Sequence, residues 1–261
     1  MIKFFRRIRY NFMETGKTGK YFKYVIGEIV LVVISILIAL QINNWNEQQK
    51  SNKLEAEYYC RLLEDLEQDY SQFNSLIKQA QGRLKASNQA LRLLQQKQTK
   101  TLDIGQQISM ATKAIYIDFK PNNSTFEDLK SSNLSIIKDK SITKSLNTYY
   151  NNIESMKSII MVNGQNAVNL AFAHDDSFAN GETQASKLYG RFKDGMEKDV
   201  YDAIVINPTE IISKDMQKRL YNNALVYTSS NIRQLELYNI IKKFAQNMTT
   251  LLKGKCKQTN D

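Results

Sequence analysis

The chain has few of the residues that interrupt helices or build catalytic and metal sites. Its 261 residues include two prolines, ten glycines, two cysteines and a single histidine. Scarce proline and glycine favour long uninterrupted helices over a fold with many turns. One histidine excludes zinc sites built from several histidines and paired-histidine metal-phosphohydrolase motifs. The sequence also lacks a Gly-x-Ser-x-Gly nucleophile elbow, so it has no serine-hydrolase signature.

The run Gly16-Lys17-Thr18 suggests a phosphate-binding loop, but its surroundings do not fit one. Such a loop needs another glycine five positions before Gly16, and that position holds Asn11. The run follows the basic and aromatic stretch KFFRRIRYN, where a buried strand is required, and it leads into a strongly apolar segment. We therefore interpret it as the cytoplasmic edge of a membrane anchor.

The apolar segment predicts a transmembrane helix over residues 24–42. Its polar residues are Glu28, Ser35 and Gln41. A helix of this length spans roughly 28 Å, close to the ~30 Å thickness of a bilayer's hydrocarbon core. A cleaved signal peptide is the main alternative, because the strictly apolar core is short. No small-residue cleavage site follows that core, which favours an uncleaved signal-anchor.

Charge predicts the orientation of this helix. Residues 1–23 contain seven basic residues and one acid, so the positive-inside rule makes them a cytoplasmic tail. Residues 43–261 then form a domain in the periplasm, and the protein is a single-pass protein of the inner membrane. The residues expected at the membrane interface are Arg6, Arg7, Arg9, Lys17, Lys20, Lys23 and Trp45.

Two stretches resemble a bacterial family of single-pass membrane proteins of unknown function. They are GKTGKYFKYVIGEIVLVVISILIALQINNWNE and, from Phe119 to Lys140, FKPNNSTFEDLKSSNLSIIKDK. The family usually has glycine where Ser35 stands and another glycine between Ser132 and Asn133. The resemblance implies the membrane anchor. It implies no activity, cofactor or catalytic residue.

Beyond the anchor, apolar residues recur at three- and four-residue steps, which predicts helices. The long helices are expected at about Trp45–Gln98, where the first one could continue the transmembrane helix past Asn43-Asn44, and over the stripes Ile142–Val168 and Met216–Leu252. Shorter helices are expected at Ile104–Ile115 and at Thr125–Ser131, the latter with a capping box between Thr125 and Asp128. Residues 173–207 read as a partly helical excursion, with a short strand at Tyr201–Ile206.

These elements predict a mainly α protein in which one N-terminal transmembrane helix is followed by an extracytoplasmic antiparallel helical bundle with a long first helix. The first and last helices also permit a coiled coil between protomers. If the last helix returns beside the first, Cys256 comes near Cys60, and a disulfide could join them in an oxidising compartment. Free thiols or pairing between chains are the alternatives.

Two features of the transmembrane segment suggest contacts within the membrane. Glu28 is an intramembrane acid near the inner edge, within snorkelling reach of the interface. Gly27, Ser35 and Ala39 lie at multiples of four residues and form a small-residue face for helix association. Partners are therefore the lipid bilayer and a second copy or another membrane or envelope protein.

Other polar groups carry weaker indications. The triplet His174-Asp175-Asp176 could act as an acid–base or metal site, but an exposed helix-end turn explains it equally well. The acids Glu64, Asp65, Glu67 and Asp69 read as the solvated face of a helix. The sequence therefore indicates no catalytic, metal or cofactor site.

Charge disfavours nucleic acid as a partner. The formal charge is +10, and the tail before the anchor supplies a net +6 of it. An interaction or scaffolding module of the cell envelope is the function that the sequence favours. A sensor-like ligand-binding bundle without its own output domain is the alternative, and an enzyme is disfavoured.

Overall fold

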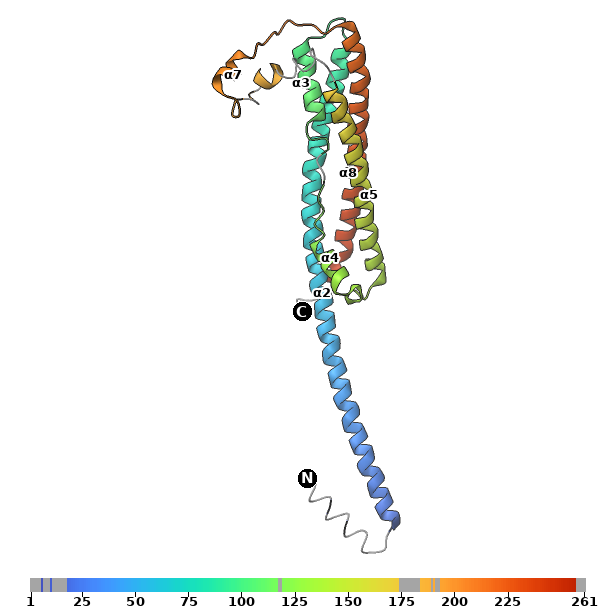
Figure 1. The fold of residues 1–261 in the computed structure, drawn as a ribbon. Coiled ribbons are helices and arrows are strands. Elements are labelled where there is room, and N and C mark those ends of the chain that lie inside the picture. Colours follow the sequence, from blue (N-terminus) through green and yellow to red (C-terminus); the bar gives the residue numbers. More distant parts are fainter. Residues whose placement is uncertain are drawn as a thin grey trace. The chain divides into compact units, whose positions relative to one another are not determined.

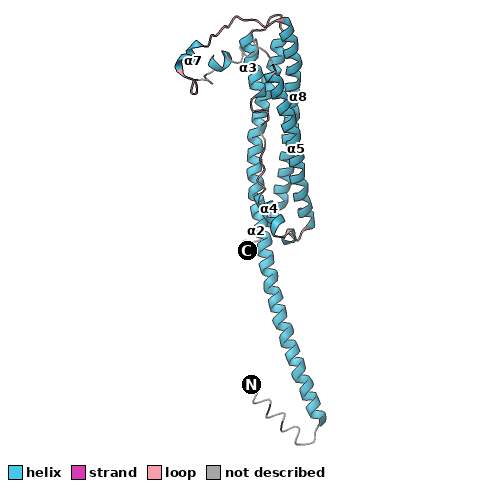
Figure 2. Cartoon of the chain, in the orientation of Figure 1, coloured by secondary structure: helices cyan, strands magenta, loops and turns pink. Residues whose placement is uncertain are grey.

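The structure, a computed structural model, describes residues 6, 10, 18–116, 119–173, 184–188, 190 and 193–256, with the backbone alone at 18–21. Most of this length is helical, and no strand occurs among these residues (Figure 2). An isolated antiparallel bridge joins Lys100 and Ile211. The helices are α2 (Thr18–Leu94), α3 (Thr101–Thr112), α4 (Ser124–Ser132), the 3-10 helix η1 (Leu134–Ile136), α5 (Lys140–Phe172), α7 (Lys198–Ala203) and α8 (Lys214–Cys256).

The chain divides into two compact units, Met1–Ala56 and Glu57–Asp261, called here the N-terminal and C-terminal units. Helix α2 begins in the first unit and ends in the second, and it runs through Asn43 and Asn44 without interruption. Neither proline lies in a helix: Pro121 precedes α4 and Pro208 stands in the turn before α8. The long helices of the sequence prediction are therefore confirmed, and their ends lie within a few residues of those expected.

In the C-terminal unit α8 runs antiparallel to α2. Side-chain contacts pair Tyr70 with Gln246 and Arg83 with Asn231, and Gln217 donates to the carbonyl of Leu94. Residue numbers rise along α2 as they fall along α8, which defines the antiparallel register. Helix α5 packs beside α8 along much of its length (Figure 1).

Two clusters of buried apolar residues form the core of this unit. The first cluster joins α2, α4, α5 and α8 around Leu62, Phe73, Phe126, Tyr149 and Tyr238. The second joins the end of α2 to α3, α5 and α8, and its members include Ala90, Ile104, Ile108, Ala167, Leu220 and Tyr227. Burying one such side chain contributes roughly 1.5–3 kcal/mol, so these clusters are the main favourable term in the folding of the unit.

Close backbone approach fixes the turn after α3. Gly164 of α5 lies against it, and a Cβ at this position would meet the carbonyl oxygen of Ile115 at 2.7 Å and the Cα of Tyr116 at 2.9 Å. Ala114, in the same turn, has a positive φ of 57°. Only glycine lets α5 pack this closely against the turn.

Two local predictions are wrong. Tyr201–Ile206 forms no strand: residues up to Ala203 belong to α7, and 204–207 have no regular structure. Thr125 and Asp128 make no capping box, because Asn123 is the N-cap of α4 and makes no side-chain cap bond. Instead, Asp65 of α2 accepts a hydrogen bond from the backbone N–H of Thr125 at 3.2 Å. A side chain from another helix therefore satisfies the first turn of α4.

Candidate functional sites: an apolar helix, a disulfide and a buried arginine

The first candidate site is the apolar part of α2. The helix is long and apolar enough to cross a membrane, and none of its most apolar 18-residue window is buried. Arg6, Lys23 and Trp45 are exposed. The backbone of Lys20 belongs to α2, whereas Arg7, Arg9 and Lys17 lie outside the described residues.

The small residues of this helix share one face with Glu28. Gly27, Glu28, Ser35 and Ala39 line the same shallow groove along the helix. The hydroxyl of Ser35 donates to the carbonyl of Leu31 at 2.8 Å. Because this hydroxyl is already bonded within its own helix, Ser35 contributes small size to the face and needs no partner for its proton.

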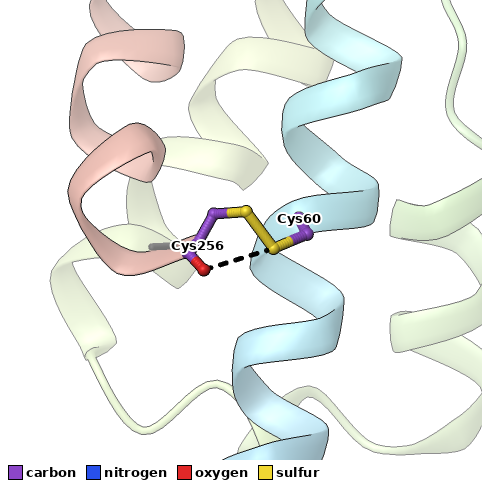
Figure 3. Close-up of a disulfide and its surroundings, with 2 residues drawn as sticks. All are labelled: Cys60 and Cys256. Atoms are coloured by element: carbon purple, nitrogen blue, oxygen red, sulfur yellow. Dashed lines mark hydrogen bonds between the residues drawn. A yellow bond between two sulfur atoms is a disulfide. The ribbon is translucent and has the colours of Figure 1, made fainter. Parts of the chain in front are cut away.

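The second candidate site is a disulfide. It joins Cys60 of α2 to Cys256, the last residue of α8, with Cα atoms 4.9 Å apart (Figure 3). The Sγ of Cys60 also lies 3.5 Å from the carbonyl oxygen of Cys256. A disulfide sulfur carries no hydrogen, so this approach is a close contact and not a hydrogen bond. The two cysteines are 196 positions apart in sequence, so the disulfide closes a long loop.

The prediction that four acids form a solvated face of α2 is wrong for one of them, Asp69. Glu64 and Glu67 are exposed, but Asp69 is fully buried. It lies three residues after Leu66 and four before Phe73, on the apolar stripe of the helix. That spacing was the signal that could have found it.

Three donors surround the Asp69 carboxylate. Its Oδ1 accepts from the backbone N–H of Asn122 at 2.8 Å and from that residue's side-chain amide at 3.2 Å, and its Oδ2 accepts from the hydroxyl of Tyr149 at 2.9 Å. Burial raises the pKa of Asp69 to about 6, and this effect exceeds the lowering by the hydrogen bonds. The carboxyl group therefore links α2, α5 and the segment before α4.

The third candidate site centres on Arg83 of α2, which lies between the two apolar clusters and is 5 % exposed. Its Nε donates to Oδ1 of Asn231 at 3.2 Å and its Nη2 to Oε1 of Gln234 at 2.7 Å. No carboxylate among the described residues makes an ion pair with it. Burial lowers the pKa of Arg83. A buried guanidinium with neutral partners alone is costly, because desolvation is not offset by an opposite charge.

The two amides beside Arg83 are held by further hydrogen bonds. The Nδ2 of Asn231 donates to the hydroxyl of Ser87 and to the carbonyl of Ala111, each at 3.0 Å. The Nε2 of Gln234 donates to the carbonyl of Ile115 at 3.0 Å and to the hydroxyl of Tyr238 at 3.1 Å. These bonds turn both amide oxygens toward the guanidinium.

A cavity of about 610 Å³ opens beside Arg83, between α2, the end of α3 and residues 184–188. Two cations, Arg83 and Lys113, belong to its described lining, which contains no acid. The lining also includes four neutral polar side chains, Gln79, Gln106, Ser109 and Ser186. Its volume falls within the range of small-molecule sites, roughly 300–1,000 Å³.

Sequence reasoning missed this site because it followed the leucines of α2. Leu84 and Leu91 are partly exposed, whereas Arg83, Ala86, Ser87 and Ala90 are buried. As for Asp69, polar residues at the spacing of buried positions were the signal that could have revealed the site. The triplet at residues 174–176 lies outside the described residues. Within the described part, no group of three His, Cys, Asp or Glu side chains could hold a metal ion.

Comparison with known proteins shows which family the chain resembles. A protein-family model described as a family of unknown function (DUF6090) matches residues 28–168, more than half of the chain. The matched range contains Ser35, Cys60, Asp69 and Arg83. No curated protein and no solved structure matches the chain.

Proposed function

The chain belongs to this family of unknown function, and from that premise we propose that it is a single-pass membrane protein of the cell envelope. Residues 1–23 lie in the cytoplasm, residues 24–42 cross the inner membrane, and residues 43–261 form an antiparallel helical bundle in the periplasm. The bundle is an interaction or scaffolding module, and its partner is a second copy or another membrane or envelope protein. We propose no catalytic role and no cofactor for it.

The observation that carries this proposal is the uncovered apolar helix. Leaving one large aliphatic side chain in water costs roughly 1.5–3 kcal/mol relative to burying it. A bilayer removes that cost along the whole stretch. The exposed large apolar side chains in this part of α2 are Ile26, Ile29, Val30, Leu31, Val32, Val33, Ile34, Ile36, Leu37, Ile38, Leu40 and Ile42.

Two further observations support the orientation. The basic residues before the span are of the kind that stays on the cytoplasmic side. The cysteines of the C-terminal unit form a disulfide, a bond that persists in oxidising compartments such as the periplasm. Both observations favour a periplasmic C-terminal unit.

The small-residue face of α2 supports association within the membrane. Gly27, Ser35 and Ala39 allow a second helix to approach closely, which favours van der Waals packing between helices in lipid. The hydroxyl of Ser35 is bonded to Leu31 and does not compete with that packing. A larger side chain on this face would separate the two helices.

The proposal is tested by crosslinking the tagged full-length protein in its native cells and purifying it from membranes. We expect it in the membrane fraction, crosslinked to a second copy or to one recurrent membrane or envelope protein. The double variant Ser35→Leu, Ala39→Leu should lose that crosslink while staying in the membrane. Val33→Leu is the matched control, because position 33 lies about 200° around the helix from position 35. Recovery from the soluble fraction, or an unchanged crosslink in the double variant, would contradict the proposal.

A second candidate function is favoured by the cavity beside Arg83. A bundle that binds a small molecule and acts through a membrane partner is a sensor-like module. The cavity has the size and the convergent polar groups of a ligand site. In such a module, a partner in the membrane would carry the signal.

A further inference from the structure

The geometry points to a binding site for a small organic carboxylate in the cavity beside Arg83. Burial of this arginine is energetically costly. Arg83 is 5 % exposed, so its guanidinium has lost most of its hydration, and the amide oxygens of Asn231 and Gln234 replace only part of it. Positions that depart from core rules in this way are expected at functional sites.

The arrangement of partners leaves the cation available to an anion. Arg83 is held through its Nε and Nη2, and Nη1 makes no hydrogen bond within the described part of the chain. The two amides that hold it are themselves fixed by four hydrogen bonds, so the guanidinium is preorganised. Preorganisation reduces the entropy lost on binding.

Charge and hydrogen-bonding groups of the lining select the class of ligand. The described lining carries two cations and no acid, so it attracts an anion. A planar guanidinium matches the geometry of a carboxylate through two parallel N–H···O bonds. Gln79 and Ser186 can donate to or accept from other polar groups of the ligand. Met110, Ala114 and Ala185 provide an apolar wall for its carbon skeleton.

The ligand is therefore a compact carboxylate with polar substituents, and not an extended polyanion. A polyanion would need a row of exposed cations, whereas the described lining holds two cations, the buried Arg83 and the exposed Lys113. This inference deepens the second candidate function and rests on it for its biological meaning. Binding itself does not depend on membrane topology or on association of α2.

The experiment measures binding of sodium succinate, citrate and acetate to the full chain in lipid nanodiscs, by thermal shift and by calorimetry. Sodium chloride at matched ionic strength and sodium phosphate are the comparison salts. We expect at least one carboxylate to raise Tm in a saturable way that neither comparison salt reproduces. Absence of any such shift would overturn the inference, and a saturable response to phosphate alone would overturn the assignment of a carboxylate.

Three variants locate the site. Arg83→Gln should weaken binding of the active carboxylate at least tenfold, whereas Arg92→Gln removes the same charge from an exposed position of α2 and should leave binding unchanged. Gly82→Leu tests the same site while keeping Arg83, so its result does not depend on whether Arg83→Gln folds. A Cβ at Gly82 would meet open space at the cavity, so the leucine should fill the cavity and abolish binding.

Gly254→Leu is the matched control for the cavity variant, because Gly254 is also a helical glycine with open space around its Cβ. It should bind the carboxylate as the wild type does. Unchanged binding in Gly82→Leu would place the ligand elsewhere and overturn the inference. This failure would leave the crosslinking and membrane-fraction results of the first proposal unaffected, so the two proposals can fail separately.

Discussion

Two ionisable side chains of α2, Asp69 and Arg83, occupy positions that the helix pattern assigns to the core. Each has its own set of neutral hydrogen-bond partners, and each lies where residues from several helices meet. Burial shifts the pKa of each toward the neutral form, upward for the acid and downward for the base. The protonation of these two residues thus affects the stability of the C-terminal unit.

The raised pKa of Asp69 predicts how stability changes with pH. In the folded protein its pKa is about 6, against 3.8 ordinarily, so the folded state binds the proton more tightly. Its stabilising contribution is therefore complete below about pH 4 and is lost as pH rises through about 6. The full loss is about 3 kcal/mol, from about two pKa units at 1.36 kcal/mol each. Urea unfolding between pH 4 and 7 measures it.

Asp69→Asn should remove this pH dependence. The asparagine can still accept from Asn122 through its oxygen, and its NH₂ can donate to the hydroxyl of Tyr149. Asp65, whose negative charge also raises the pKa of Asp69, is unchanged in this variant. Glu64→Gln changes an exposed acid of the same helix and should leave the pH profile unchanged. A wild-type profile identical to that of Asp69→Asn would contradict the prediction.

At the scale of helices, the periodicity of apolar residues predicted most of the helices that the structure contains. Leu146, Ile153 and Ile160 recur at steps of seven residues, and all of them are buried in α5. The scarcity of proline predicted that α2 could run on without a break. Asp139 accepts from the backbone N–H of Ser141 at the start of α5, close to the start that the sequence indicates.

Contacts between helices could not be predicted from the sequence. The bond from Asp65 to the first turn of α4 joins positions 60 residues apart, and local rules favoured a capping box there. The site at Arg83 needs Asn231 and Gln234 from α8 and the turn after α3, and nothing local pairs these segments. The register between helices decides which polar residues meet, and single-helix periodicity contains no information about register.

The packing of α5 against the turn after α3 gives a matched pair of glycine predictions. Gly164→Ala should lower the free energy of unfolding by about 1–3 kcal/mol, because its Cβ would contact the backbone of Ile115 and Tyr116. Gly82→Ala should raise it by up to about 1 kcal/mol, because that Cβ meets open space and alanine favours the helix. Denaturant unfolding of the two variants beside the wild type measures both changes. Equal effects of the two substitutions would contradict the close approach.

At the scale of the whole molecule, the disulfide connects the start of the C-terminal unit to its end. Closing so long a loop restricts the unfolded chain and contributes about 5 kcal/mol to stability in the chain-entropy account. We expect the protein from oxidising conditions to migrate faster on a non-reducing gel than after reduction. Cys256→Ser should abolish that difference and lower the free energy of unfolding by about this amount.

Cys60→Ser is the control for this prediction, because it removes the same bond from the other side. Both single variants and the double variant should show the same loss of stability. A species of twice the mass on the non-reducing gel would show that the cysteines pair between chains. Different losses in the two single variants would mean that one thiol has a second role.

The position of the disulfide also determines how the C-terminal unit responds to tension. A pull applied between the apolar part of α2 and the end of α8 passes directly through Cys60 and Cys256. The loop between these cysteines, which are 196 positions apart in sequence, then carries no force, so its helices stay folded while the ends are stretched. Reduction opens the loop and adds up to about 670 Å of extensible chain, at about 3.4 Å per residue. In the oxidised protein the folded loop therefore lies outside the path of the force, and in the reduced protein this loop can be extended.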